Sequence, residues 1–280
     1  MRTKLLSLLL ILAGTTPAAA LDVTGCPFVV PPGEVGVVQN DIDCAEGAPD
    51  EGFLDGRYGI MLERGARLDL NGHTVTLLSA PPLEAPIACR SVCEVHGPGT
   101  VETSTGEGVG ISVRGNRRAK IRDLEVLGFS SGIVASGRAE VTNVLVDAAI
   151  SGIAGRVLDL HGVDVTLPGA PFDLPQSGCI EATQSNSRVT GEDVTLSGCW
   201  YGVYGTRRVK LSGLTVTGSN VGVFSVGVVD LTSSSVTGSE SADLYTARPP
   251  RLTSSACDTS LQYLPKLDAP GGTWGVCQND

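Results

Sequence analysis

A six-residue pattern recurs along this chain and constrains its fold more than any other feature. The pattern is an apolar residue, any residue, then Gly, Asn, Asp or Ser, a usually apolar residue, any residue and Val. Its starts lie 19 to 29 residues apart, which is the interval expected for one coil of a repeat protein. Clear copies begin at Leu70, Ile121, Val141, Leu160, Val189, Leu211 and Leu231, and weaker ones at Val95 and Leu252.

A glycine followed by an apolar residue forms a second anchor after most copies. The third position of the six-residue pattern suits the left-handed backbone that Gly, Asn and Asp tolerate. The intervals between anchors are too short for helices or long hairpins, but they suit short parallel strands stacked coil upon coil. Leucine-rich repeats would show a Leu-x-x-Leu-x-Leu pattern, and propeller blades are longer. The anchor glycines are Gly110, Gly132, Gly152, Gly178, Gly202 and Gly222.

Composition favours the same fold. Glycine makes up 36 of the 280 residues, which disfavours helix interiors, and an apolar fraction of 41% excludes a disordered chain. No strict Gly-x-y period occurs, so collagen is excluded. We therefore expect an all-β chain folded as a single-stranded right-handed parallel β-helix, a solenoid of about eight or nine coils. The handedness is expected from precedent among folds of this type.

The N-terminal residues have the features of a secretory signal peptide. Arg2 and Lys4 precede the apolar run Leu5–Ala13, and a run of alanines offers a cleavage site after Ala20. We therefore expect a secreted protein, extracellular or periplasmic, with no other segment long enough to cross a membrane as a helix. The expected divisions are 1–20 signal peptide, 21–67 N-terminal cap, 68–255 parallel β-helix and 256–280 C-terminal disulfide-held cap.

The net charge argues against nucleic acid as a partner. The whole chain carries 20 basic and 30 acidic residues, a net charge of −10. Loss of Arg2 and Lys4 leaves 18 basic residues and a net charge of −12, whereas nucleic-acid-binding domains are normally basic. We expect a monomer whose partner is a glycan.

All eight cysteines follow the expected cleavage site, which predicts four disulfides formed in an oxidising compartment. Their grouping in four local couples suggests the pairings 26–44, 89–93, 179–199 and 257–277, although sequence alone leaves the connectivity open. They are too scattered for a zinc site. The cysteines are Cys26, Cys44, Cys89, Cys93, Cys179, Cys199, Cys257 and Cys277.

The segment Leu68-Asp-Leu-Asn-Gly-His-Thr-Val75 resembles the first-coil signature of the pectin-lyase-like right-handed β-helix proteins. Upstream, Cys26 and the run Asp41-Ile-Asp-Cys44, followed by Tyr58–Leu62, are similar to the N-terminal segment of those proteins. The resemblance covers the mature chain as architecture. It implies the fold but no single activity, since the superfamily includes lyases, hydrolases, epimerases and non-enzymatic surface proteins. The Trp and Asp-His motifs of pectate lyases and the Asp arrangement of polygalacturonases are absent.

Strand alternation separates interior from exterior residues around each copy of the pattern. The start residue and the residue two before it should fill the interior. Equivalent residues of adjacent coils should lie about 4.8 Å apart. The outward column one residue before each start contains Asp69, Glu94, Lys120, Glu140, Asp159, Arg188, Lys210 and Asp230. The column one residue after contains Asn71, His96, Arg122, Thr142, His161, Thr190, Ser212 and Thr232.

These columns predict either a charge ladder or a catalytic patch. A ladder would support strand register through neighbouring opposite charges, at Lys120–Glu140, Asp159–Arg188 and Lys210–Asp230. A patch would use a carboxylate, an imidazole and guanidinium groups to bind a uronate and move a proton. The candidate catalytic residues are His161, Asp159, Arg188, Glu140, Lys120 and Arg122.

His161 is the sharpest single candidate because the chain contains only three histidines. The alternative is a surface imidazole bonded to a neighbouring coil. His73 stands in the family signature, which implies a structural role, and His96 ranks lower because its coil is irregular. Glu192 occupies an apolar pattern position, so it is either buried and functional or exposed by a bulge, and we favour the bulge.

A line of arginines precedes the pattern starts by three or four residues. Arginine binds carboxylates and sulfates in bidentate geometry, so this line predicts a surface for an acidic glycan. The alternative is a set of solubilising turn residues that cap free carbonyls. The line contains Arg117, Arg118, Arg138, Arg156, Arg207, Arg208 and Arg248.

Aromatic residues complete the predicted substrate-binding set. Trp200, Tyr201 and Tyr204 flank Gly202 and suggest either stacking on sugar rings or core packing. Lys210 belongs to the same predicted set. The Pro-rich insertion at 168–176 is expected to form a cleft wall.

Together these features predict a β-helix protein that binds an acidic polysaccharide and, as an enzyme, would process it. Lyase or epimerase chemistry suits alternating carboxylates and cations better than hydrolysis, which needs two carboxylates at a defined separation. The alternative is a non-catalytic structural or adhesion protein of the cell surface or periplasm. No cofactor is evident. Outward carboxylates could hold calcium, but no compact Asp-rich loop indicates it.

Overall fold

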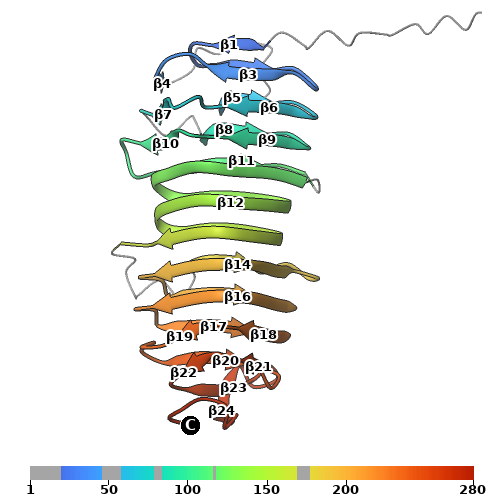
Figure 1. Cartoon of the computed structure of the whole chain (residues 1–280), viewed down its shortest axis with the longest axis vertical. Coiled ribbons are helices and arrows are strands. Elements are labelled where there is room, and N and C mark those ends of the chain that lie inside the picture. The colour runs from blue at the N-terminus through green and yellow to red at the C-terminus, as the bar shows by residue number, and fades with distance from the viewer. Residues whose placement is uncertain (1–19, 46–57, 79–83, 116–117, 169–176) are drawn as a thin grey trace, which may run out of the picture.

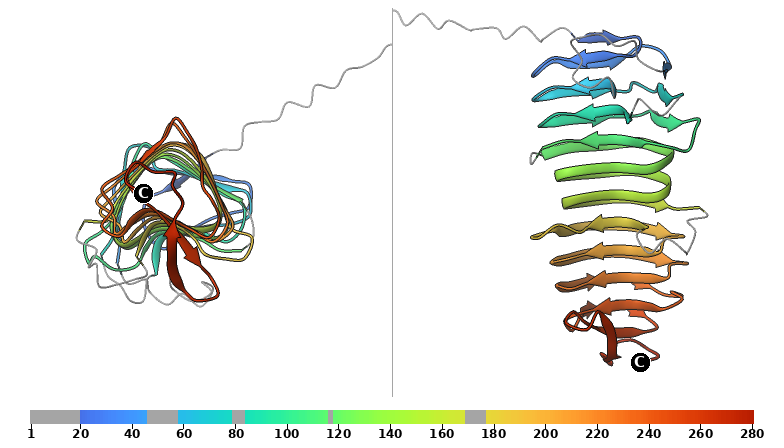
Figure 2. Two further views of the ribbon diagram at one scale, coloured as in Figure 1. Left: turned by 90° about the horizontal axis from the view of Figure 1, so that it is seen from below. Right: turned by 180° about the vertical axis from the view of Figure 1, so that it is seen from behind.

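The computed structural model is a solenoid of about eight turns stacked along one axis (Figure 1). It describes residues 20–45, 58–78, 84–115, 118–168 and 177–280, which form strands and turns and contain no helix. Seen along the axis, the coils superpose as a triangle (Figure 2), so each coil supplies strands to three sheet faces, named here A, B and C. Residues 1–19 of the expected signal peptide, Arg117 and residues 169–176 of the Pro-rich insertion lie outside the described residues.

The three faces are built from strands that pair in parallel with the equivalent strands of the next coil. Face A contains β1 (Leu21–Val23), β3 (Val35–Val38), β6 (Ala66–Asp69), β9 (Cys93–His96), β18 (Val228–Thr232) and β21 (Arg251–Thr253). Face B contains β4 (Ile42–Cys44), β7 (Thr74–Leu77), β10 (Thr100–Thr103), β19 (Ser235–Val236) and β22 (Ala256–Cys257).

Face C contains β2 (Phe28–Val30), β5 (Tyr58–Leu62), β8 (Ala85–Cys89), β11 (Val109–Val113), β13 (Gly178–Ala182), β15 (Tyr201–Gly205), β17 (Val221–Ser225), β20 (Ala242–Thr246) and β23 (Ser260–Leu264). Two long strands turn from face A onto face B, β14 (Arg188–Ser197) and β16 (Arg208–Thr217). The longest, β12 (Arg118–Thr166), winds through all three faces. Only β24 (Ala269–Thr273) pairs antiparallel, with β23, among the described strands.

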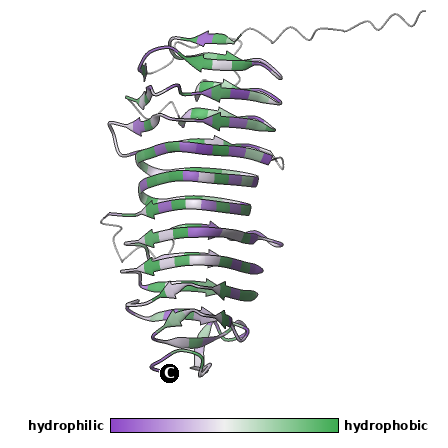
Figure 3. Ribbon diagram, in the orientation of Figure 1, coloured by the Kyte–Doolittle hydropathy of each residue, from purple (hydrophilic) through white to green (hydrophobic). Residues whose placement is uncertain are grey.

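Strand alternation places apolar side chains inside the solenoid, as the pattern predicts. Hydrophobic and hydrophilic residues are interspersed along the strands (Figure 3). The predicted interior residues are buried throughout, from Leu68 in β6 to Leu231 in β18, and Ser187 is the one polar member among them. At the last copy, Leu252 is only partly buried and packs against the core. The interior is therefore a continuous apolar column that runs from coil to coil.

The anchor glycines stand where face C meets the final Val of the pattern. A Cβ added at Gly132 would lie 2.3 Å from Cγ1 of Val146, and one at Gly222 would lie 2.3 Å from Cγ1 of Val236. Any larger residue would therefore collide with the core. In the coil of β13, Cys179 rather than Gly178 takes this place.

The strand register differs from the prediction by two residues at two places. Leu68, rather than the start Leu70, pairs with Val95, and the second shift lies in β14. Val189 pairs with Leu158, the residue two before a start, and the start Leu160 pairs with Gly191. The left-handed turn residue of this coil is accordingly Asp193, with φ 54°. Side chains alternate with a period of two, so a shift by two keeps every residue on its face. Alternation could not detect it.

This register overturns one predicted pair of charges. Asp159 lies beside Thr190 in the next coil, so its predicted neighbour Arg188 is wrong. Arg188 instead pairs with Val157 on one side and Arg208 on the other. The same shift places Glu192 outward, opposite His161, because Val194 fills the interior. Glu192 is exposed, as we favoured, but the register rather than a bulge exposes it.

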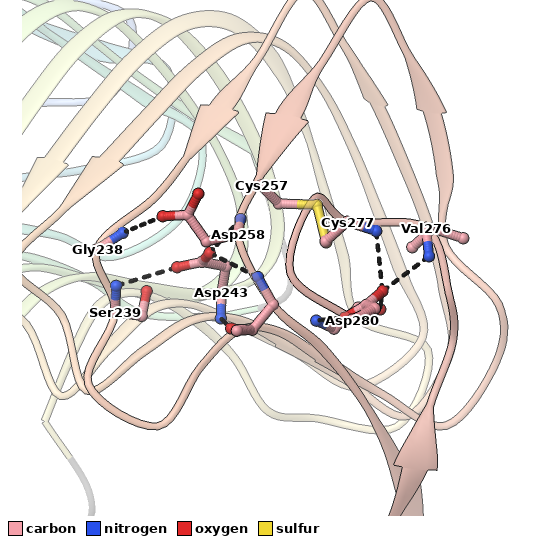
Figure 4. The surroundings of a disulfide bond; sticks show 10 residues. Gly238, Ser239, Asp243, Cys257, Asp258, Val276, Cys277 and Asp280 are labelled. Atoms are coloured by element: carbon pink, nitrogen blue, oxygen red, sulfur yellow. Dashed lines mark hydrogen bonds between the residues drawn. A yellow bond between two sulfur atoms is a disulfide. The ribbon is translucent and has the colours of Figure 1, made fainter.

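The four predicted disulfides are present, Cys26–Cys44, Cys89–Cys93, Cys179–Cys199 and Cys257–Cys277. The last joins β22 to the C-terminal segment (Figure 4). Four disulfides are compatible with an extracellular or periplasmic location. Among the described residues, no helix is long and apolar enough to span a membrane.

Candidate functional site

Face A carries charged side chains outward, and in its middle coils these charges are matched. Arg118 forms an ion pair with Glu140, Arg138 lies 3.1 Å from Asp159, and Lys120 lies 3.2 Å from Glu94. We name these three pairs the paired ladder. Glu140 and Lys120, predicted to pair with each other, thus contact Arg118 and Glu94 respectively. Two arginines of the predicted glycan-binding line, Arg118 and Arg138, are occupied by the protein's own carboxylates.

His161 lies between two carboxylates on the outward side of face A. Its Nε2 is 3.4 Å from Oδ1 of Asp159 and its Nδ1 is 3.3 Å from Oε1 of Glu192. The hydroxyl of Thr190 also donates to Asp159, at 3.0 Å. The structure therefore brings together two of the predicted catalytic residues, His161 and Asp159. It does not bring Arg188 to them.

A second histidine, His96, is the buried member of a charged network on the same face. Its Nδ1 lies 3.1 Å from Nη2 of Arg122. A guanidinium can only donate, so a neutral ring that accepts this hydrogen bond carries its proton on Nε2. That Nε2 lies 3.3 Å from Oε2 of Glu94 but lacks the direction of a hydrogen bond. The strand neighbour of His96 in β6 is Asp69, which we had placed in the column of Glu94.

The surroundings of His96 favour its neutral form. Burial lowers the pKa of His96, and the nearby cations Arg67 and Arg122 lower it further against the opposing charges of Glu94 and Asp69. Burial raises the pKa of Glu94, but the hydrogen bond and charge of Lys120, with the charge of Arg67, hold it below its ordinary value. This network lines a pocket of about 210 Å³ together with Glu140 and Thr142.

Near the C-terminal end of face A, arginines surround a larger hollow of about 540 Å³. We name it the cationic hollow. Its lining comes from three successive turns between faces C and A and contains four guanidinium groups and one carboxylate. The lining residues are Thr206, Arg207, Arg208, Val226, Gly227, Val228, Asp230, Arg248 and Arg251.

The carboxylate in the hollow does not satisfy these arginines. Asp230 lies 3.8 Å from Nη2 of Arg208 and 3.9 Å from Nε of Arg251, both beyond hydrogen-bond distance. Arg207 donates to the neutral side-chain amide oxygen of Asn186. Strand pairing makes Asp230 the neighbour of Lys210, as predicted. It also adds Arg188 beside Arg208, so positive charge accumulates here.

The predicted sugar-binding aromatic residues lie on face C rather than beside these charges. Tyr204 stacks on Phe224 with ring centres 4.9 Å apart, and Tyr201 meets Tyr204 edge to face at 5.0 Å. Further along, Tyr263 of β23 packs against Phe224 at 5.0 Å, and its hydrogen bond to Asp268 raises its pKa to about 12. The rings cover one another. They therefore pack β23 against the coils rather than offer a flat face on which a sugar ring could stack. Trp200 is half-buried.

Two further polar features lie outside these clusters. Glu181, the strand neighbour of Tyr204, has a pKa raised by burial and accepts a hydrogen bond from the amide of Gly178 at 3.0 Å. A hollow of about 500 Å³ lies between faces A and B and carries Asp123, Glu125 and Asp164. Within the described part of the chain, no cluster of His, Cys, Asp and Glu could hold a metal ion.

Sequence reasoning missed Arg251 and ranked His96 too low. Arg251 immediately precedes the start Leu252, so continuing the outward column by one coil would have found it. The charged surroundings of His96 had no local signal, since Arg67 and Arg122 lie in the coils on either side of it. Arg156, of the predicted arginine line, is half-buried near the start of face A.

Comparison with known proteins finds no matching family model, no matching curated protein and no matching solved structure. The fold and site define a disulfide-bonded parallel β-solenoid with one charged face, matched in its middle coils and cationic near its C-terminal end. The function must therefore be inferred from the geometry of that face.

Proposed function

We propose that this protein binds an acidic polysaccharide outside the cell or in the periplasm, with the cationic hollow as its principal contact. The observation that carries the proposal is the set of four arginines, from two coils, around the single carboxylate of Asp230 in the coil between them. Such guanidinium groups form charge-assisted hydrogen bonds with anionic ligands. From the sequence we expect right-handed winding, disulfide-held ends and an architecture that resembles the pectin-lyase-like proteins. A solenoid of that kind would present this face as a rigid surface.

The proposal is for binding without a chemical step. Proton abstraction beside a uronate would need a base close to a cation that neutralises the substrate carboxylate. His161 has carboxylates at both ring nitrogens, and the arginine predicted to serve it, Arg188, lies beside Arg208 instead. The lyase and epimerase reactions are therefore less well supported than recognition. The remaining alternative is a rod that binds no glycan.

Two double variants with the same change in net charge test the proposal. Arg207→Ser/Arg248→Ser removes two cations of the hollow, and Arg118→Ser/Arg138→Ser removes two cations of the paired ladder. Charge-assisted hydrogen bonds are each worth about 1.5–3 kcal/mol, so the first variant should lose at least about tenfold in affinity. The second should change affinity by less than about threefold.

The measurement is retention and affinity on polygalacturonate, alginate and dextran sulfate, with uncharged dextran as the control polymer. Equal weakening by the two double variants would mean that net charge alone drives binding and would contradict the assignment to the hollow. No binding to any acidic polymer favours the rod. Ultraviolet absorbance of unsaturated products, followed on the same mixtures, reports lyase activity, which we expect to be absent.

A further inference from the structure

We propose that the cationic hollow recognises tetrahedral ester anions, sulfate or phosphate monoesters carried on a glycan, in preference to the carboxylates of uronic acids. This inference rests on the proposed function and specifies the acidic group at the same site. It is carried by the directions from which the arginines approach and by the position of the protein's own carboxylate among them.

The arginines approach the hollow from two coils, one on each side of the coil that carries Asp230. Arg207 ends the turn from β15 to β16 and Arg208 begins β16. Asp230 lies in β18 of the next coil. In the coil after that, Arg248 lies in the turn before β21 and Arg251 begins β21. Successive coils are about 4.8 Å apart. The guanidinium groups therefore surround the hollow along the axis rather than lying in one plane.

The protein's own carboxylate, Asp230, lies among these arginines, and its distances to them are too long for hydrogen bonds. The two oxygens of Asp230 face different arginines, Oδ2 toward Arg208 and Oδ1 toward Arg251, yet both distances are close to 4 Å. Asp230 is tethered to β18, and its two oxygens stop short of the donors that lie one coil above and one coil below it. An ester anion of sulfur or phosphorus presents three terminal acceptor oxygens arranged as a pyramid.

Two backbone amides and one hydroxyl around the hollow already donate hydrogen bonds within the protein, so they do not compete with the arginines as donors to a ligand. The amide of Val228 donates to the carbonyl of Arg207 at 2.9 Å, and the amide of Gly227 donates to the hydroxyl of Ser225 at 3.1 Å. The side-chain hydroxyl of Thr206 is used on the carbonyl of Gln184, at 2.8 Å. Recognition therefore falls to the guanidinium groups, which bind sulfate and phosphate through parallel N–H donors.

Charge supports the same ligand class. Four guanidinium groups and one carboxylate leave an excess of positive charge in the hollow, in a chain whose net charge is −10. A polymer that carries dense ester anions can place more than one charge within three coils. Asp230 would repel any anion, so its removal should strengthen binding while leaving the arginines in place.

The test uses dextran derivatives that share one backbone and one degree of substitution, namely dextran sulfate, dextran phosphate, carboxymethyl dextran and uncharged dextran. Affinities of the full chain are measured at about 0.15 M salt, together with those of Asp230→Asn and Arg207→Ser/Arg248→Ser. We expect dextran sulfate or dextran phosphate to bind at least about tenfold more tightly than carboxymethyl dextran. Asp230→Asn should raise that affinity severalfold, and the double arginine variant should abolish the preference.

Each outcome has a distinct meaning. Equal or tighter binding of carboxymethyl dextran overturns this inference and leaves the proposed function standing. Binding to none of the charged dextrans, nor to polygalacturonate and alginate, overturns both. A preference that survives in Arg207→Ser/Arg248→Ser overturns the assignment to the hollow. The ratio of sulfate to phosphate binding tells which ester the site takes.

Discussion

The middle and C-terminal coils of this solenoid use carboxylates for different purposes. In the middle coils, Glu140 and Asp159 face arginines one coil away and cancel their charge. Near the C-terminal end, the buried Asp243 binds the backbone instead, accepting hydrogen bonds from the amides of Ser239, Asp258 and Thr259 at 3.0, 2.7 and 3.1 Å (Figure 4). The four arginines of the cationic hollow share the one carboxylate of Asp230 there, at 3.8 and 3.9 Å from two of them. Binding capacity on a repetitive surface thus depends on where the opposite charges are used.

The largest expected effect tests whether both regions depend on the same close coil packing. A Cβ at Gly227 in the cationic hollow would lie 1.7 Å from the carbonyl oxygen of Arg207, and one at Gly97 would lie 1.7 Å from that of Asp123. Gly227→Ala and Gly97→Ala should each lower the free energy of unfolding by more than about 3 kcal/mol. Denaturant titration measures this. Gly272→Ala, where nothing lies within 4 Å of the added Cβ, should change little.

The next effect tests the structural use of the C-terminal carboxylate. Asp243→Asn replaces an acceptor with an amide that has both donor and acceptor character, so backbone amides lose a charged partner. We expect a loss of about 2 kcal/mol in unfolding free energy. Asp258→Asn is the matched control, because Asp258 accepts only a 3.4 Å hydrogen bond from Gly238 (Figure 4). Equal losses in the two variants would contradict the role assigned to Asp243.

The stability of the protein should depend on pH through His96, on the N-terminal side of the paired ladder. The folded-state pKa of His96 is lowered from its ordinary 6.5, so the unfolded chain takes up this proton first as the pH falls. Stability is therefore full above about 6.5 and declines as the pH falls toward the folded-state pKa. His96→Gln should remove that part of the decline, measured as urea midpoints at several pH values. His161→Gln serves as the control and should retain it.

The smallest expected effect concerns the paired ladder itself. Arg118→Ser/Arg138→Ser breaks two ion pairs at the surface, where such pairs contribute at most about 1 kcal/mol each. We expect a small loss of thermal stability that high salt conceals. Arg207→Ser/Arg248→Ser should leave stability unchanged or slightly raised, because it relieves repulsion between cations. A loss of stability in Arg207→Ser/Arg248→Ser would mean that these arginines stabilise the protein, and it would contradict the contrast between the two regions.

The repeat predicted the fold because each coil must bury the same apolar positions in one shared interior. Leu68, Ile121, Leu160 and Leu211 recur for that reason and are buried. The four disulfides were likewise predictable from local couples of cysteines. The register at Val189 was not, because a shift by two preserves burial, and backbone hydrogen bonds to the coils on both sides decided it.

The candidate site was predictable in composition but not in arrangement. The sequence alone determined that charged residues occupy one outward face and that arginines gather at its turns, since alternation and turn position are local properties. Only the tertiary structure decided that Arg118 and Arg138 are matched, that Arg207 and Arg248 face a hollow, and that His96 is buried. Those outcomes depend on which residue lies one coil above or below, and a distance of about 4.8 Å between coils corresponds to some twenty or more residues along the chain.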